Sequence, residues 1–558
     1  MKTARLLSVV LLLLVSIPVA LASAYNARPK LVVVIVIDQF RSDYLERYHE
    51  QFGDGGFRLF LERGAYFTDC NYDYANTRTA PGHATLFTGS YTSEHGIIAN
   101  EWWDPQKKKR VSSVEDDGTR FVGINRDGAA ASPHNLLSDT LGDELKLATG
   151  GKSRVFAISF KDRAAVLPAG FSGDAAYWID AKSGDWITST YYRSNLPQWV
   201  SNFNGGHRAE KFWNREWKDR DGTVLGSTAP RTAKDGTQLG FYDVIGATPF
   251  ANEYQLEFAK ELVLYEKLGT GPVTDLLVIS LSANDILGHR VGPDSPQMRG
   301  MALELDRQLA EFFGFLGHQI GMADVWLALS SDHGIAPLPD FAKTLRLPAA
   351  NLDAKGLRDQ INSLLSKKYS KKADYVLDLD YPLAWLNAEA FAGTPDGKDE
   401  SVAEDHVGEA MKQVGLAGYF TKSQLARGDF SANEIGRRYA HSYTPEGGSY
   451  VIGIPSPFQV GTTSGTDHET PFSYDTHVPL AFYGLAFQTG IYRTHAEPVD
   501  LAVTLASLLG INAPAKATGR VLTEALQTPY RPSPGTSPGA VPSAAPATLP
   551  GAAAGESQ

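Results

Sequence analysis

The chain has 558 residues, of which 43% are hydrophobic and 21% are charged, so it can bury a large core and is globular in composition. Its formal net charge is −11 and no concentrated stripe of lysine and arginine runs along it, which argues against nucleic acid as its main partner. The single cysteine, Cys70, cannot form a disulfide within the chain. We expect it to be buried and unreactive, and an exported protein of this size to depend on its packed core for stability.

The first residues have the pattern of a secretory signal. Lys2 and Arg5 precede an apolar run over residues 6–21, and small residues then supply a cleavage pattern. We interpret residues 1–24 as a signal peptide; the rival interpretation is a membrane anchor, but the run is short for a span. The mature chain is then expected to be periplasmic or secreted, with no stable membrane span.

Four apolar runs each end in polar residues that can do chemistry. The first, over residues 31–37, is a continuous Val, Ile and Leu run that ends in Asp38, as in a strand covered on both faces of a parallel sheet. Runs at 155–159, 276–281 and 325–329 precede FKDR, SANDILGH and SSDHG. Each ending alone could be a helix cap or a surface turn. Because ligands bind at the carboxyl edge of parallel sheets, we expect the four endings to converge there.

Helix-like segments lie between and after these strands. They show apolar residues at helical spacing over residues 135–147, 250–267, 298–316 and 500–509. The alternation predicts an α/β fold with a mostly parallel sheet and helices on both faces. Strand character returns at 449–454 and 478–483.

Two stretches, at about 194–242 and 339–437, interrupt the alternation. We interpret them as insertions that form a cap-like layer on a single catalytic domain over residues 25–527. The second insertion contains a helix-like segment at 357–368 and a strand-like one at 384–386. Pro, Ala, Gly and Ser dominate residues 528–558, which we expect to form a disordered tail outside the core.

The strand ends supply ligand types for metal ions. Asp285 and His289 stand four residues apart, a spacing that places both side chains on one face of a helix. Asp332 and His333 are adjacent, which suits ligation from a turn. With Asp38 and a histidine from near the C-terminus, they make three carboxylates and three imidazoles, a set suited to two Zn²⁺ ions. Either pair alone is also common as surface decoration.

The stretch NTRTAPGH at residues 76–83 contains the candidate nucleophile, Thr79. A threonine hydroxyl is a poor nucleophile at neutral pH and needs a base or a metal to ionise it. In a two-metal site the ions lie about 4 Å apart, so one can bind an alkoxide while the other stabilises the leaving oxygen. We expect Thr79 to open a helix with Pro81 in its first turn, where the free amides favour an anion. Without metals, Thr79 is a plain N-cap.

Together these segments resemble a known family. The motifs, in chain order, are VVIVID, NTRTAPGHATLFTGSY, HGIIANEWWD, SFKDR, NDILGH, SSDHG and GTDHETPFSYDTHVPLAFYG. In this combination the chain resembles the alkaline phosphatase superfamily, and within it the threonine-nucleophile alkaline phosphatases of the PafA type, related to the type I phosphodiesterase/nucleotide pyrophosphatase family. The resemblance covers about residues 31–522 and implies a three-layer α/β sandwich with inserted cap elements.

The resemblance also implies roles for individual residues. One zinc ion would be held by Asp38, Thr79, Asp332 and His333, with Thr79 becoming phosphorylated, and a second zinc ion by Asp285, His289 and His468. His477 is the rival for the last position. Glu469 follows His468 where the family pattern leads us to expect a glycine, which puts the geometry of that loop in question.

Three further residues resemble the group that holds the phosphoryl oxygens in the monoesterase branch, namely Asn100, Lys161 and Arg163. A monoester carries two negative charges, which a lysine and an arginine can neutralise. A diester carries one charge and a second bulky group, so an apolar pocket would suit it better. The pair of cations therefore favours monoesters; the alternative is two solvated charges after a strand.

The leading hypothesis is a periplasmic, zinc-dependent alkaline phosphatase that acts on small phosphate esters with two zinc ions per chain. One alternative is a phosphodiesterase or nucleotide pyrophosphatase of the same superfamily. A sulfatase is disfavoured because Cys70 does not begin a Cys-x-Pro-x-Arg pattern. The alternative of another class is a non-catalytic protein that binds metal or phosphate. The sequence does not indicate the natural substrate or the oligomeric state.

Overall fold

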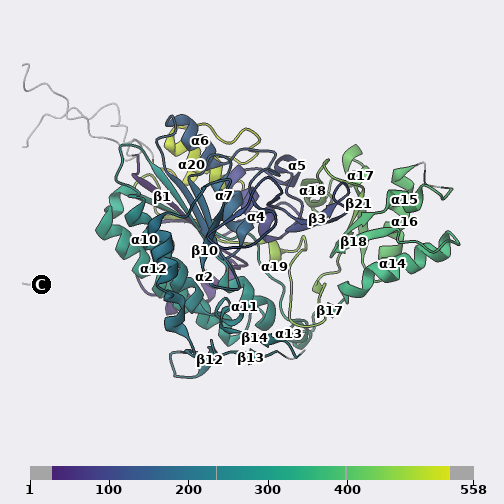
Figure 1. Cartoon of the computed structure of the whole chain (residues 1–558), viewed down its shortest axis with the longest axis horizontal. Coiled ribbons are helices and arrows are strands. Elements are labelled where there is room, and N and C mark those ends of the chain that lie inside the picture. The colour runs from purple at the N-terminus through teal and green to yellow at the C-terminus, as the bar shows by residue number, and fades with distance from the viewer. Residues whose placement is uncertain (1–27, 234–235, 396, 398, 528–558) are drawn as a thin grey trace, which may run out of the picture.

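The structure is a computed structural model that describes residues 28–527, apart from 234–235, 396 and 398 (Figure 1). Within this part of the chain, a ten-stranded sheet runs through the centre in the order β24-β2-β23-β16-β1-β15-β8-β9-β10-β6. Its strands are β1 (Leu31–Ile37), β2 (Ala65–Phe67), β6 (Phe121–Val122), β8 (Val155–Ser159), β9 (Ala175–Ile179), β10 (Trp186–Ser189), β15 (Asp275–Leu281), β16 (Val325–Ser330), β23 (Leu480–Tyr483) and β24 (Gly490–Tyr492).

Strand β1 occupies the middle of this sheet. It pairs in parallel with β15 on one side and with β16 on the other, while β8 and β9 continue the parallel arrangement beyond β15. Strand β23 pairs antiparallel with β16, and β10 pairs antiparallel with β9. The four apolar runs predicted from the sequence are therefore four neighbouring parallel strands, and their carboxyl ends meet at one edge.

The two faces of β1 are packed into two different cores. Val33 and Ile35 belong to the core under α10 (Pro249–Tyr265) and α12 (Pro296–Gln319). The alternate residues, with Val34 among them, belong to the core on the other face. There the covering helices are α4 (Thr79–Thr88), α6 (Leu141–Ala148), α7 (Asp162–Ala169) and α20 (Asp500–Leu509). Figure 1 shows α10 and α12 on one side of the sheet and α6 and α20 on the other. The predicted α/β architecture with helices on both faces is confirmed.

Helix α6 begins later than the apolar spacing predicted. The expected helix over residues 135–147 starts only at Leu141, because Thr140 closes its N-terminus. The Thr140 side chain accepts a hydrogen bond from the Asp143 amide, and the Asp143 carboxylate accepts one from the Thr140 amide at 2.9 Å. This reciprocal cap satisfies two amides that the helix leaves free, so residues before 140 run as irregular chain.

A smaller layer stands at one end of the molecule, seen at the right of Figure 1. Its four-stranded antiparallel sheet has the order β18-β19-β21-β20. Its elements are α14 (Ala354–Lys368), β18 (Val376–Asp380), β19 (Leu383–Leu386), α15 (Ala388–Phe391), α16 (Glu400–Gln413), β20 (Gly418–Thr421), α17 (Lys422–Arg427), α18 (Glu434–His441) and β21 (Tyr450–Ile454). Leu357, Ile361 and Val407 are among the residues of a separate hydrophobic core in this layer. The strand predicted at 449–454 thus pairs in the cap, because an apolar run does not reveal which sheet it joins.

The remaining elements are shorter. They are α2 (Asp43–Arg47), α3 (Phe57–Arg63), α5 (Thr92–His95), β3 (Glu101–Asp104), β4 (Lys109–Ser112), β5 (Glu115–Asp116), β7 (Ala130–Ala131), α8 (Gln198–Gly205), β11 (Glu216–Lys218), β12 (Val224–Ser227), β13 (Arg231–Thr232), β14 (Gln238–Leu239), α9 (Phe241–Ile245), α11 (Ala283–Val291), α13 (Pro339–Thr344), β17 (Ala350–Asn351), β22 (Gln459–Val460) and α19 (Ser473–Thr476), with single turns at His49–Gln51, Arg208–Phe212, Met322–Asp324 and Thr523–Ala525. Cys70 is fully buried, as predicted. Across the described residues, no helix is both long and apolar enough to pass through a bilayer. The signal peptide at 1–24 and the tail at 528–558 lie outside the described residues.

Candidate active site and metal centre

Three carboxylates lie together at the carboxyl edge of the central sheet. Asp38 follows β1 directly, Asp285 lies in the first turn of α11 after β15, and Asp332 follows β16. All three are buried, with 0%, 4% and 0% of their surface exposed. Neighbouring parallel strands bring them to the same point, as the sequence predicted.

One cluster joins Asp38, Asp332 and His333. Nε2 of His333 lies 3.5 Å from Oδ1 of Asp38 and 3.6 Å from Oδ2 of Asp332. These three atoms are buried, and within the described part of the chain none of them has a hydrogen-bond partner. Buried polar atoms are normally satisfied, so three converging lone pairs without partners fit a bound cation. Their ligand atoms all lie within 4.8 Å of one another.

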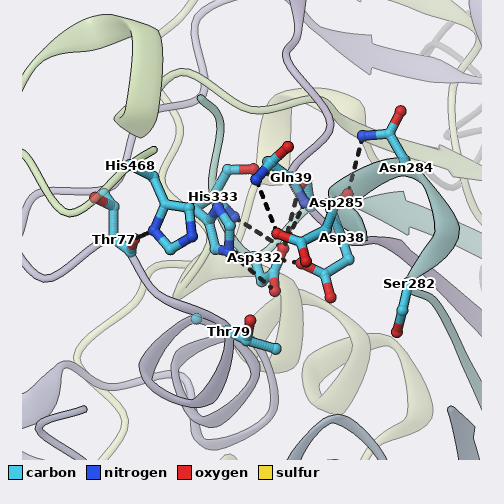
Figure 2. Close-up of polar contacts among 12 residues, drawn as sticks. Asp38, Gln39, Thr77, Thr79, Ser282, Asn284, Asp285, Asp332, His333 and His468 are labelled. Atoms are coloured by element: carbon cyan, nitrogen blue, oxygen red, sulfur yellow. Dashed lines mark hydrogen bonds and ion pairs between the residues drawn. The ribbon is translucent and has the colours of Figure 1, made fainter. Parts of the chain in front are cut away.

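A second group of ligand types lies beside the first. Asp285 and His289 face each other across one turn of α11, with 3.1 Å between Oδ1 and Nε2. His468 contacts both histidines, with ring centroids 5.2 Å from His289 and 3.9 Å from His333. Ligand atoms within 4.8 Å of one another also join His468 with Asp285 and His333, and separately with His289 and Asp467. The two clusters share one continuous polar centre (Figure 2).

Backbone carbonyls orient all three histidines. Nδ1 of His289 lies 3.0 Å from the Thr466 carbonyl, that of His333 lies 2.9 Å from the Gly334 carbonyl, and that of His468 lies 2.6 Å from the Thr77 carbonyl. Because a carbonyl only accepts, Nδ1 of each ring carries a proton, which leaves Nε2 as the nitrogen through which each ring can bind a metal. Metal-binding histidines are commonly held in this way. The arrangement therefore fits metal ligation through Nε2.

Thr79 is the first residue of α4 and is 1% exposed. Figure 2 shows its side chain near Asp38 and Asp332. Pro81 lies in the first turn of this helix, as predicted. The Ala80 amide donates to Oδ1 of Asn100 at 2.8 Å, which places the Asn100 side chain beside the start of the helix.

Lys161 connects Thr79 with the carboxylates. Its ammonium lies 2.6 Å from Oδ2 of Asp38, 2.7 Å from Oδ2 of Asp285 and 3.3 Å from Oγ1 of Thr79. Arg163 lies in the first turn of α7, two residues further on. Its guanidinium lies 3.8 Å from the Asp162 carboxylate, and its buried Nε has no hydrogen-bond partner among the described residues.

The pKa values record how strongly these charges interact. Burial, with the carboxylates of Asp285 and Asp332, raises the pKa of Asp38 well above its ordinary value. Burial alone would also raise the pKa of Asp285, but the Lys161 ammonium and His289 hold it well below the ordinary range. Burial would lower the pKa of Lys161, yet Asp285 and Asp38 raise it. Three carboxylates packed together therefore depend on positive charge at their centre.

Several residues at this centre were not identified from the sequence. Gln39, which has a left-handed φ of 64°, donates from its amide to Oδ1 of Asp332 at 3.0 Å and from its side chain to Oδ1 of Asp285 at 2.8 Å. It thus ties the two clusters together. Asn284 donates to the Asp38 carbonyl at 3.0 Å. The only signal for these residues was their position next to an acidic strand end, which does not reveal a partner far along the chain.

The loop that carries His468 holds a residue other than glycine in a left-handed conformation. Glu469 has a left-handed φ of 81°, a conformation that glycine adopts more readily. Thr77 accounts for part of this geometry, because its hydroxyl accepts hydrogen bonds from the amides of Glu469 at 3.1 Å and Thr470 at 3.0 Å. His477, the rival ligand, instead contacts the Thr68 carbonyl through Nε2 at 2.9 Å and belongs to neither cluster.

Comparison with known protein families shows the group to which the chain belongs. The model of the type I phosphodiesterase/nucleotide pyrophosphatase family matches residues 32–432, which is more than half of the chain. The chain belongs to this family.

Proteins that match this chain over most of their length indicate which members of the family it resembles. The chain is 34% identical to a protein of Myroides odoratus named calcium-transporting ATPase, covering 91% of this chain and 96% of that protein. It is 32% identical to the alkaline phosphatase PhoV of Synechococcus elongatus, covering 90% and 94%. The crystal structure of the alkaline phosphatase PafA superposes with a TM-score of 0.80 at 30% identity and covers 90% of this chain and 99% of that structure. Within the phosphodiesterase family, the chain is therefore a homologue of the PafA and PhoV alkaline phosphatases, which supports phosphomonoesterase activity.

Proposed function

We propose that this chain is a zinc-dependent alkaline phosphatase that hydrolyses phosphate monoesters through a phosphothreonine intermediate. The observation that carries the proposal is the position of Lys161, whose ammonium contacts Thr79 and the two carboxylates of Asp38 and Asp285. A nucleophile, an anion-binding cation and metal ligands thus meet at one buried point. That combination is the minimum that phosphoryl transfer to a hydroxyl requires.

We assign the metal ligands to two sets. One zinc ion would be held by Asp38, Thr79, Asp332 and His333, and the other by Asp285, His289 and His468. Imidazole nitrogens and carboxylates in sets of three are ligands that Zn²⁺ prefers, while sites for Mg²⁺ and Ca²⁺ are built from oxygens. When bound, a pair of zinc ions supplies the charge that activates a hydroxyl and stabilises a leaving oxygen.

The protein's own residues would carry the reaction in two displacements. Oγ1 of Thr79 forms a bond to phosphorus as the bond to the ester oxygen breaks, and the ester oxygen leaves as the protonated alcohol. Water then attacks the phosphothreonine, which releases inorganic phosphate and restores the threonine hydroxyl. Asn100, Lys161 and Arg163 would hold the non-bridging oxygens during both steps, because charge on these oxygens must be balanced throughout.

The charge of these residues favours monoesters over diesters. Lys161 and Arg163 supply two positive charges for the two negative charges of a monoester. Rates on a phosphate monoester and a matched diester, measured with the same enzyme preparation, test the preference. A higher kcat/KM on the diester would favour the phosphodiesterase alternative.

The decisive experiment changes the nucleophile. We expect Thr79→Ala to lower kcat on a chromogenic phosphate monoester by about a thousand-fold or more, because removal of a nucleophile abolishes the covalent route. Thr79→Ser keeps a hydroxyl and should retain turnover. Acid quenching during turnover, followed by peptide mass spectrometry, should find one phosphoryl group on the peptide that contains Thr79. Full activity of Thr79→Ala would refute the proposal.

We also propose that the chain works in the periplasm or outside the cell, from the signal pattern at residues 1–24. Fractionation of cells that express the full chain tests this, with N-terminal sequencing to locate the cleavage site. Recovery of uncleaved chain in the cytoplasmic fraction would contradict it. The transport activity in the name of the Myroides odoratus relative is not part of this proposal, because Lys161 and the carboxylates at the strand ends form a site suited to phosphoryl transfer.

A further inference from the structure

A hollow of about 280 Å³ lies beside the proposed reaction centre, over the carboxyl ends of β8 and β9. Most of the side chains that line it are apolar or aromatic, and they include Phe160, Ile179, Tyr242, Ile245 and Ile286. A dry apolar cavity of about 150 Å³ suffices to bind benzene. The hollow therefore has room for an aromatic ring or a branched aliphatic group.

Two residues lie between the hollow and the reaction centre. Lys161 lines it, and the ammonium of this lysine contacts Thr79. Ile286 also lines it and directly follows Asp285 on α11. Strands β8 and β9, which follow β15 in the sheet, thus place an apolar space beside the carboxylates. The hollow is therefore separated from Thr79 by the side chain of Lys161.

Glycines keep the hollow open at two positions. A Cβ added at Gly184, whose φ is +74°, would lie 2.3 Å from Cε1 of Tyr242, so only glycine lets the ring lie there. A Cβ at Gly246 would lie 3.3 Å from Cδ1 of Ile286. Tyr254 holds the first of these turns in place by donating its hydroxyl to the Gly184 carbonyl at 2.9 Å. The apolar walls are therefore fixed by packing in the fold.

The two carboxylates of the lining are already engaged. Asp180 accepts from the amide and hydroxyl of Ser183, both at 3.0 Å, and pairs with Arg126. Asp243 accepts from the Gly240 amide at 2.8 Å. Carboxylates held in this way do not need a cationic ligand, so the space is suited to an uncharged group.

We propose that this hollow binds the alcohol portion of the phosphate monoester and selects substrates in which that portion is aromatic or branched aliphatic. The inference rests on the proposed function, because it assigns the ester group to a place next to the phosphoryl site. A monoester has a single organic substituent, so the hollow has one occupant. The free energy would come from burial of apolar surface against Tyr242, Ile245 and Ile286.

The test compares benzyl phosphate with methyl phosphate. In wild-type protein we expect a higher kcat/KM for benzyl phosphate, and Tyr242→Ala should lower the benzyl-to-methyl ratio of kcat/KM about ten-fold. Ala181→Trp, at an exposed position on the edge of the hollow, should block the space and lower the ratio similarly. The matched control is Ala148→Trp, at the exposed end of α6, which should leave the ratio unchanged.

Two measurements separate this proposal from the activity itself. Inhibition by inorganic phosphate, which has no substituent, should be unaffected by Tyr242→Ala and Ala181→Trp. Calorimetry should show that benzylphosphonate binds more weakly to both variants, with no turnover required. Equal losses on methyl and benzyl phosphate, or unchanged benzylphosphonate binding, would overturn the hollow as the binding site. Absence of monoester hydrolysis in the wild-type protein, with benzylphosphonate binding still dependent on Tyr242, would instead refute the proposed function.

Discussion

Nε of Arg78 lies 3.2 Å from Oε1 of Glu469, so the residue before the proposed nucleophile is paired with the residue after a proposed metal ligand. Arg78 is 1% exposed, and its guanidinium also binds Asp380 and the Tyr381 carbonyl in the cap. Burial would lower the pKa of Arg78, but the carboxylates of Asp380 and Glu469 raise it. One buried cation thus holds the nucleophile turn, the ligand loop and the cap together.

Replacing this cation should cost stability as well as activity. We expect Arg78→Met to lower the free energy of unfolding by about 3 kcal/mol, because it leaves the mostly buried Glu469 without its cation and Asp380 with Arg110 alone. Denaturant unfolding and kcat/KM on a monoester measure the two effects. The control Arg307→Met removes an exposed arginine paired along α12 and should cost less than about 1 kcal/mol. Equal losses in the free energy of unfolding for the two variants would show that the buried ion pair stabilises the fold no more than the exposed one.

The cations at the end of β8 should determine ester preference. Lys161→Ala and Arg163→Ala are each expected to lower kcat/KM on a monoester about a hundred-fold, since each removes a charge that we assign to the phosphoryl oxygens. The loss on a diester should be smaller because a diester has one charge fewer. Lys182→Ala, at an exposed lysine on the loop after β9, is the control. A loss that is the same on both esters would argue against a role in selecting monoesters.

Two carboxylates, those of Asp285 and Asp467, lie beside His289. Asp285 contacts Nε2 of His289 at 3.1 Å, while Asp467 lies 3.5 Å from its Nδ1. We expect Asp285→Asn to lose one zinc ion per chain in metal analysis. Asp467→Asn should retain both ions with affinity lowered about ten-fold, as for residues that support a ligand. The reverse result would reassign the metal ligand to Asp467.

Buried His95 should make the fold sensitive to acid. Its Nδ1 accepts from the Ile97 amide at 3.1 Å and its Nε2 lies 3.1 Å from the Thr85 hydroxyl, so the ring is neutral in the fold. Burial lowers the pKa of His95 to about 3, below the ordinary value of about 6.5. The stabilisation is therefore complete above about pH 6.5 and is lost as the pH falls towards 3.

The matching variant is His95→Gln, which cannot titrate. Between pH 6.5 and 5, wild-type protein should lose about 2 kcal/mol more free energy of unfolding than the variant, at about 1.4 kcal/mol per pH unit. Urea unfolding of both proteins after chelator treatment gives the comparison, because any effect of metal loss is then common to both. Parallel pH profiles would contradict the prediction.

The parts of the fold that were predictable are those set by local pattern. β1 (Leu31–Ile37) and α20 (Asp500–Leu509) have the predicted bounds, because a continuous apolar run and a clear helical stripe depend little on distant contacts. The apolar runs also located Asp38, Asp285 and Asp332, because neighbouring parallel strands end at the same edge of the sheet. The predicted start of the helix expected at 135–147 was wrong, because the N-cap at Thr140 begins the helix at Leu141 despite the apolar spacing before it.

The parts that were not predictable depend on contacts between distant segments. Gln39 joins Asp285 and Asp332, and Thr77 orients His468, yet both are ordinary polar residues in the sequence. Glu469 stands where the family pattern leads us to expect glycine, and only the structure shows that Arg78 pairs with it. The hollow beside Lys161 is built from five separated segments, so no local pattern could have indicated it.

Ser330 at the end of β16 is paired with Leu480 at the start of β23, so the chain leaves and re-enters the sheet at directly opposed residues. Residues 331–479, which include the cap, therefore form one large insertion between the paired strands β16 and β23. Asp332 and His333 lie just after the departing strand and His468 lies shortly before the returning one. A change in the length of the cap therefore leaves β16 and β23 in register, and the cap residues on which the nucleophile turn depends are Asp380 and Tyr381, which bind Arg78.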